Sequence, residues 1–126
     1  MLAVVLLCPL VVAGILKPDR RGHGTHRQLG LPPCTVVVLF GQRCPTCGMT
    51  TAWSHLVRGQ VLEAFRANVG GAILALVDLA AVPWLLWSAI RGRWLGWVPN
   101  GNVLAAGMAA ILAVTLIDWA VRLLCS

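Results

Sequence analysis

The chain has 126 residues, of which 59% are apolar and 11% charged, and its formal net charge is +6. A soluble domain carries about a quarter charged residues, so this composition excludes an ordinary water-soluble domain and points to a lipid bilayer as the surrounding phase. No recognition motif accompanies the basic residues, and nucleic-acid binding is therefore not expected. The length suits one domain, and we interpret residues 1–126 as a single integral membrane domain.

Three apolar segments occur along the chain, at residues 2–16, 69–90 and 103–121. A helix crosses the roughly 30 Å hydrocarbon core with about 20 residues. The second and third segments meet that length, while the first is shorter and contains Pro9. The first also lacks the basic start and the Ala-x-Ala site of a signal peptide, so a retained anchor is favoured over a cleaved leader. The sequence thus predicts an all-α membrane protein with three transmembrane helices.

Residues 17–68 form a cysteine-bearing insert between the first two spans. Its first part, residues 17–33, has the glycine and proline content of a loop. Residues 36–40 form an apolar run that suits a strand, or a segment tucked into the membrane interface or against the bundle. Two short amphipathic helices are predicted after it, at residues 49–58 and 60–67. We expect these helices to lie at the membrane interface, and a groove for a partner protein is the alternative.

The distribution of basic residues predicts an orientation. Seven of the ten Lys and Arg residues lie in the insert, and Arg122 would share its side of a three-span protein. Arg91 and Arg93 lie on the opposite side. Because basic residues near span ends favour the cytoplasm, eight against two predicts a cytoplasmic insert and an outside N-terminus.

The spans contain two carboxylates and several small residues. Asp78 falls near the centre of its span with no Lys or Arg to pair with, so we expect a protonated Asp78 bonded to a neighbouring helix, with ion or proton passage as the alternative. Asp118 is close enough to the end of its helix to reach the interface. Small residues recur four positions apart at Gly71 and Ala75 and again in the last span, a spacing that suits close packing of the two helices and is also common in any alanine-rich span.

Cysteines are the residues most able to carry chemistry. Cys34, Cys44 and Cys47 lie in the insert, whereas Cys8 and Cys125 lie at span ends and are interpreted as packing residues. Two cysteines three positions apart can reach one tetrahedral metal ion, and Cys34 would supply a third sulfur. The sequence therefore predicts a metal site, with zinc as the candidate ion.

Histidines are candidates for the fourth ligand of that metal site. His23 or His26 from the loop, or water, would complete it. His55 is the weaker candidate, because it lies on the polar face of the predicted helix together with Ser54 and two helical turns beyond Cys47.

Two other roles for the cysteines stay open. Cys44 at the start of a helix suits an attacking thiol and Cys47 a resolving one, because a helix N-terminus lowers a cysteine pKa. Alternatively Cys34 pairs with one of them as a disulfide staple, which an exported location would favour over a cytosolic one. The insert is too short for a complete thioredoxin fold.

The cysteine spacing also carries a family resemblance. The residues that carry it are Cys34, then Cys44-Pro45-Thr46-Cys47-Gly48-Met49-Thr50, Arg58-Gly59-Gln60 and Ala64-Phe65-Arg66-Ala67-Asn68. Over about residues 34–90 the chain resembles the bacterial membrane family catalogued as domain of unknown function 2752. The resemblance implies a shared fold and a bacterial inner-membrane location, and it brings no established activity. Thr51 stands where that family usually has arginine.

These observations favour a non-enzymatic function. No Ser-His-Asp ordering, phosphate loop or dinucleotide fingerprint is visible in the sequence. The leading interpretation is a membrane assembly or accessory module whose cysteines bind metal or shape a docking surface for another membrane protein or a second copy. The alternative is a membrane thiol–disulfide oxidoreductase that uses Cys44 and Cys47.

Overall fold

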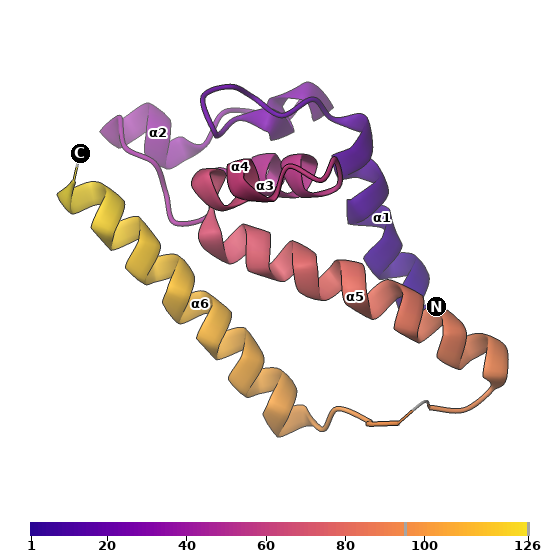
Figure 1. The fold of residues 1–126 in the computed structure, drawn as a ribbon. Coiled ribbons are helices and arrows are strands. Elements are labelled where there is room, and N and C mark those ends of the chain that lie inside the picture. The colour runs from indigo at the N-terminus through magenta and orange to yellow at the C-terminus, as the bar shows by residue number, and fades with distance from the viewer. Residues whose placement is uncertain (95, 126) are drawn as a thin grey trace.

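Helices make up all of the regular secondary structure in the computed structural model (Figure 1), which describes residues 1–94 and 96–125. Within these residues there are no strands, and the all-helical prediction is confirmed. The helices in chain order are α1 (Leu2–Ile15), the 3₁₀ helix η1 (Thr25–Leu29), α2 (Thr35–Phe40), α3 (Met49–Leu56), α4 (Val61–Ala67), α5 (Val69–Arg91) and α6 (Gly101–Leu124).

Two of these helices, α5 and α6, are long and apolar enough to cross a bilayer. They indicate a membrane protein. Helix α1 is apolar but has only 14 residues, and Pro9 lies inside it without ending it. At 1.5 Å per residue α1 is about 21 Å long, which is shorter than the hydrocarbon core.

Residues 36–40 adopt a helix, so their interpretation as a strand is wrong. Helix α2 begins after Cys34 and ends at Gly41, whose φ is +66°. The backbone N–H of Val38 donates to the carbonyl oxygen of Cys34 at 3.1 Å, and that of Gly41 donates to Val37 at 3.0 Å. A six-residue run with no neighbouring strand satisfies its backbone groups only through such local bonds. The preceding loop also contains a short turn of helix, η1.

The core lies where α3, α4 and the start of α5 meet. Its buried members are small and medium apolar side chains, namely Ala52, Leu56, Ala64, Ala67, Ala72 and Ala75. Trp53 and Phe65 pack against them. Helix α3 is thus enclosed by other helices, whereas α4 keeps Val61 and Leu62 exposed. The short helices therefore have different surroundings, although both were expected to lie flat at the interface.

Helix α1 is joined to α3 through its last carbonyl groups. The Ser54 hydroxyl, predicted to lie on a polar face, is buried and donates to the carbonyl oxygen of Leu16 at 2.6 Å. The Arg58 guanidinium donates to the carbonyl oxygens of Ala13 at 3.2 Å and Gly14 at 3.0 Å. The last carbonyls of a helix lack intrahelical partners, so these side chains cap α1.

Small residues of α5 do allow close packing, but with different partners from those predicted. A Cβ atom on Gly71 would lie 3.0 Å from Met49 of α3, and one on Gly70 would lie 1.7 Å from the Thr115 hydroxyl of α6. The alanines of α6 are exposed. Helices α5 and α6 therefore meet at Gly70 and Thr115, and they diverge toward their long connection (Figure 1).

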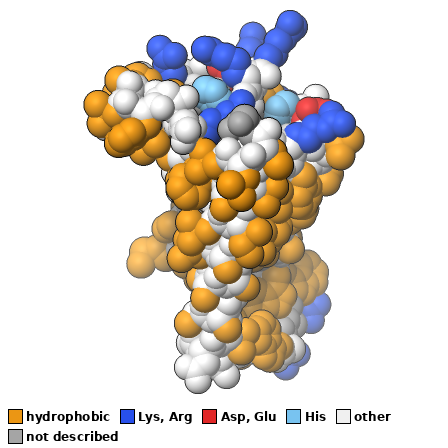
Figure 2. Space-filling view, turned by 90° about the vertical axis from the view of Figure 1, so that its left-hand side faces the viewer, with side chains coloured by type: hydrophobic (Ala, Val, Ile, Leu, Met, Phe, Trp, Pro, Cys, Tyr) orange, Lys and Arg blue, Asp and Glu red, His pale blue; other side chains and the backbone are white. Residues whose placement is uncertain are grey.

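Charged side chains gather at one end of the molecule. Figure 2 shows most Lys and Arg side chains over the insert, apolar side chains along the helices below it, and a smaller group of basic side chains at the opposite end. We call residues 17–68 the cap. This separation places a polar, basic end on an apolar shaft, the distribution expected of a protein that enters a bilayer.

Candidate metal centre

Three sulfur atoms come together in the cap. The Sγ atoms of Cys34, Cys44 and Cys47 all lie within 4.8 Å of one another, and the three residues are half-buried. The Sγ of Cys34 lies 3.4 Å from that of Cys44, which lies 2.9 Å from the Sγ of Cys47. We call this group the cysteine cluster. It brings together the three cysteines that the sequence singles out, whereas Cys8 and Cys125 are exposed.

Local backbone structure positions the cluster. Cys34 is the residue that precedes α2, while Cys44 and Cys47 flank a turn in which the Cys47 N–H donates to the carbonyl oxygen of Cys44 at 3.0 Å. Because a turn of this kind places residues three apart on the same side, both sulfur atoms face Cys34.

Gly48 ends that turn at a position where no side chain fits. Its φ is +89°, in the left-handed region that glycine adopts without strain. A Cβ atom there would lie 2.5 Å from the carbonyl oxygen of Gly22 and 2.7 Å from that of Ala67. Three segments therefore converge on this glycine. They are the basic loop (residues 17–33), the cysteine turn (residues 44–47) and the end of α4.

Asn68 links the cysteine turn to α5. Its buried side chain donates from Nδ2 to the carbonyl oxygens of Pro45 at 3.0 Å and Cys47 at 3.1 Å. Its Oδ1 accepts from the Gly71 N–H at 2.8 Å, which caps the N-terminus of α5. In the sequence, Asn68 stands out only as part of the family pattern, and nothing there predicts this clamp.

The surroundings of the two cysteines of the turn give their thiols different pKa values. Burial raises the pKa of the Cys44 thiol, but hydrogen bonds from Cys47, Thr46 and Cys34 outweigh it and lower that pKa to about 7. Burial and the hydrogen bond to Cys44 raise the pKa of Cys47 to about 12. A single thiolate, stabilised by neighbouring hydrogen-bond donors, can bind a soft metal ion first. Metal binding then releases the protons of the other two thiols.

The cluster fits a tetrahedral metal ion with modest adjustment. Sulfur ligands of one zinc ion lie about 3.8 Å apart, because each Zn–S bond is about 2.3 Å long. Cys34 and Cys44 are close to that spacing, and Cys44 and Cys47 need to separate by less than about 1 Å.

The histidines named as fourth ligands lie near the cluster but outside it. No histidine nitrogen belongs to the group in the part of the chain that the structure describes. His26 lines the same cavity of about 260 Å³ as the three cysteines, and its Nε2 lies 3.3 Å from the carbonyl oxygen of Pro32. Burial, with the charges of Arg43 and Arg21, keeps the pKa of His23 below its ordinary value, which favours the neutral imidazole that ligation requires.

His55 lies away from the cysteines. Its Nδ1 is 2.6 Å from the Gln60 side-chain oxygen, and it lines a different cavity, between the basic loop and α4. The helix between Cys47 and His55 separates them, as the sequence analysis expected.

A buried hydroxyl pair under the cluster was not expected. The Oγ1 atoms of Thr25 and Thr51 lie 2.6 Å apart with both residues fully buried, and Thr25 also accepts from the Asp19 N–H at 3.0 Å. Thr51 occupies the position where the family resemblance implies arginine. Here that position holds the basic loop on α3.

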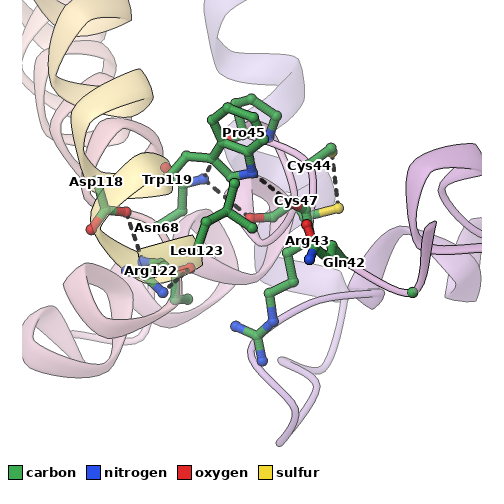
Figure 3. A pocket seen from close by; sticks show the side chains of 12 residues that line it. Gln42, Arg43, Cys44, Pro45, Cys47, Asn68, Asp118, Trp119, Arg122 and Leu123 are labelled. Carbon is green, nitrogen blue, oxygen red and sulfur yellow. Dashed lines mark hydrogen bonds and ion pairs between the residues drawn. The ribbon is translucent and has the colours of Figure 1, made fainter. Parts of the chain in front are cut away.

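A second cavity, of about 380 Å³, lies between the cysteine turn and the end of α6 (Figure 3). The Trp119 indole N–H donates to the carbonyl oxygen of Arg43 at 2.6 Å, and Arg122 donates to the carbonyl oxygen of Arg66 at 2.8 Å. Asp118 pairs with Arg122 at 2.9 Å. Cys44 and Cys47 also line this cavity, so the cluster is reached from two sides.

Asp78 takes no part in the cluster. It is buried on α5, and within residues 1–94 and 96–125 neither of its carboxylate oxygens has a hydrogen-bond partner. The bond to a neighbouring helix that we expected is therefore not formed.

Comparison with known sequences identifies one family. Residues 34–87 match the family model described as Protein of unknown function (DUF2752). This match confirms the resemblance drawn from the cysteine pattern, and it covers Cys34, Cys44 and Cys47. No curated protein and no solved structure matches the chain.

Proposed function

Since residues 34–87 are those of the DUF2752 family, whose function is unknown, we propose that this chain is a membrane assembly or accessory module whose cysteine cluster holds a thiophilic metal ion, most simply zinc. The observation that carries this proposal is the mutual approach of three sulfur atoms within 4.8 Å. Three thiolates with one open position suit tetrahedral zinc, and His26, His23 or water would complete the set.

The metal would have a structural effect because of what the three ligands connect. Cys34 begins α2, the cysteine turn precedes α3, and Asn68 ties that turn to α5. One ion would therefore hold α2 against the helices that enter the membrane. Helix α2 exposes Val38, Leu39 and Phe40, an apolar surface beside the cluster that supports docking of another membrane protein or a second copy.

Placement in the membrane is part of the proposal. We propose one domain over residues 1–126 with three transmembrane helices in a bacterial inner membrane, and with the cap in the cytoplasm. Helix α1 supports a third span because its N-terminal Met1–Ala3 shares a cavity with Ser88 near the end of α5, so it extends along much of that helix. The exposed Val4, Val5 and Val11 suit contact with lipid.

Metal content of detergent-purified protein tests the metal site. We expect about one zinc per chain by mass spectrometry, lost in Cys34→Ser, Cys44→Ser and Cys47→Ser variants. Cys8→Ser and Cys125→Ser are matched controls, because these cysteines are exposed and outside the cluster. Wild-type protein without metal after growth and purification with zinc would overturn the proposal.

Thiol–disulfide exchange is the second candidate, favoured by the unequal pKa values of Cys44 and Cys47. The Cys44 thiolate would attack a substrate disulfide and release one substrate thiol. Cys47, after losing its proton to solvent, would attack the mixed disulfide and release the second thiol, leaving an oxidised Cys44–Cys47 pair. Metal-free protein whose Cys44–Cys47 pair becomes oxidised as a disulfide substrate is reduced, and is returned to the dithiol form by an added dithiol reductant, would favour this candidate over the metal site.

A further inference from the structure

A basic cavity of about 420 Å³ lies in the cap, on the side of the basic loop that faces α3 and α4. The loop, the residue before the cysteine turn and α4 contribute its charged lining: Asp19, Arg20, Arg21, Arg43, Glu63 and Arg66. It is separate from the cysteine cluster, none of whose sulfur-bearing residues lines it.

The cavity carries positive charge that the protein does not neutralise. Asp19 pairs with Arg21 at 3.3 Å, and Glu63 pairs with Arg66 at 2.7 Å. Four guanidinium groups against two carboxylates leave a net charge of +2. Arg43 donates to the carbonyl oxygen of Arg21 at 2.6 Å, which aims its guanidinium at the loop. Arg20 and Arg43 are therefore the two arginines of this cavity without a carboxylate among the described residues.

The position of the cavity relates it to the membrane surface. Ala67 lines it, and the next residue, Asn68, is the N-cap of α5, so the cavity lies at the depth where that helix starts. On α4, Glu63 and Arg66 line the cavity while Val61 and Leu62 are exposed, the latter at 64% of its surface. Positive charge and exposed aliphatic side chains thus adjoin on one short helix.

We propose that this cavity binds the phosphate group of an anionic phospholipid, with its acyl chains lying beside Val61 and Leu62. Guanidinium groups bind phosphate oxygens with paired, charge-assisted hydrogen bonds. A soluble anion would use the arginines alone, whereas a phospholipid also uses the adjoining apolar edge. Basic cavities beside membrane helices commonly hold anionic headgroups. This inference rests on the membrane location proposed above, and it is independent of the metal.

Lipid-dependent stability of the purified chain tests the proposal. Melting of wild-type protein in a neutral detergent is followed while phosphatidylglycerol, phosphatidylcholine or inorganic phosphate is added. We expect stabilisation by phosphatidylglycerol and little by the other two. An Arg20→Gln/Arg43→Gln variant removes the two arginines without a carboxylate partner, and it should need roughly tenfold or more phosphatidylglycerol for the same shift, because each arginine near a lipid surface contributes about 1 kcal/mol.

The control removes the same charge elsewhere. Arg27→Gln/Arg93→Gln neutralises two exposed arginines that do not line this cavity, and it should keep the wild-type response. Equal stabilisation by phosphatidylglycerol and phosphatidylcholine would overturn the proposal. An equal effect of inorganic phosphate would also overturn it, by assigning the cavity to a free anion. Zinc content measured on the same samples shows whether the cysteine cluster is intact, so loss of metal and loss of lipid binding are distinguished.

Discussion

The side-chain amide of Asn68 donates to the carbonyl oxygen of Cys47 at 3.1 Å, while the same side chain caps the first turn of α5. One buried residue therefore connects the cysteine turn to the start of a long apolar helix. A change in the turn would be transmitted to α5 through this residue, and the reverse also holds.

Replacing Asn68 should separate the two roles of its side chain. In Asn68→Ala, α5 loses its cap and the carbonyls of Pro45 and Cys47 lose a buried donor, so we expect a loss of about 2–3 kcal/mol in the free energy of unfolding. Asn68→Asp keeps an oxygen for the Gly71 N–H but places a carboxylate against two carbonyls. We expect it to release metal more readily than wild type, measured by competition with a chelator.

One result of the Asn68 variants would contradict this prediction. If both variants hold metal as tightly as wild type, the clamp does not position the cysteines.

Gly48→Ala should destabilise the protein more than Gly41→Ala. Both glycines have positive φ, which costs an alanine about 1–2 kcal/mol. A Cβ on Gly48 would also overlap the carbonyl oxygens of Gly22 and Ala67, whereas none lies within 4 Å of a Cβ on Gly41. The difference between the melting temperatures of the two variants therefore isolates the close packing. Equal melting temperatures would show that the three segments do not converge as described.

Thiol alkylation in metal-stripped protein should follow the pKa of Cys44. Because that pKa is lowered to about 7, the thiolate fraction, and with it the alkylation rate, should rise with pH and reach half its maximum near pH 7. The Thr46 hydroxyl lies 3.2 Å from the Cys44 sulfur, so Thr46→Val should move the midpoint to higher pH. Thr35→Val, on an exposed residue of α2, is the control. An unchanged midpoint in Thr46→Val would contradict this assignment.

Arg58→Gln should loosen α1. Arg58 donates to carbonyl groups at the end of that helix and to the Ser54 hydroxyl at 2.7 Å. Losing these charged hydrogen bonds should lower the free energy of unfolding by about 2–3 kcal/mol. It should also speed proteolysis after Arg20 and Arg21, in the loop that follows α1, which limited trypsin digestion measures. Arg27→Gln is the matched control.

The intact mass of the accumulated protein should include α1. A mass that lacks α1 would contradict a retained anchor.

Asp78→Asn should leave stability unchanged or raise it. The carboxylate oxygens are buried without a hydrogen-bond partner among the described residues, and a neutral amide of the same shape avoids the cost of burying a charge. Asp118→Asn is the comparison, since it breaks the ion pair with Arg122 and should lower stability by about 0–1 kcal/mol. Poor accumulation of Asp78→Asn would show that the carboxylate itself is required.

Local patterns predicted much of the fold. The runs of apolar residues marked α5 and α6 to within a few residues, because helix length and hydropathy are properties of a continuous segment. The apolar run at residues 36–40 was ambiguous between strand and helix for the same reason: a short apolar segment has no period that distinguishes them. The structure resolves it as α2, and the part of the chain that the structure describes contains no strand for it to pair with.

The candidate site was also predictable from the sequence only in part. Cys34, Cys44 and Cys47 were evident from spacing and residue type, since a short turn holds the last two on one side. Cys34 was predicted as the third sulfur ligand, but no local spacing rule places it beside the other two, and only the tertiary structure brings it there. The histidines could not be placed from sequence, because their loop is ordered by the distant pair of Thr25 and Thr51.

The sequence by itself determined that this chain is helical, apolar enough for a membrane and basic over one segment, and that its residues 34–87 match the DUF2752 family model. Tertiary structure alone decided that Asn68 clamps the cysteine turn, that Arg58 caps α1 and that Gly48 lies where three segments meet. The reason is physical. Composition and periodicity act over neighbouring residues, whereas these contacts join positions far apart in the chain, and only the packing of the helices brings such positions together.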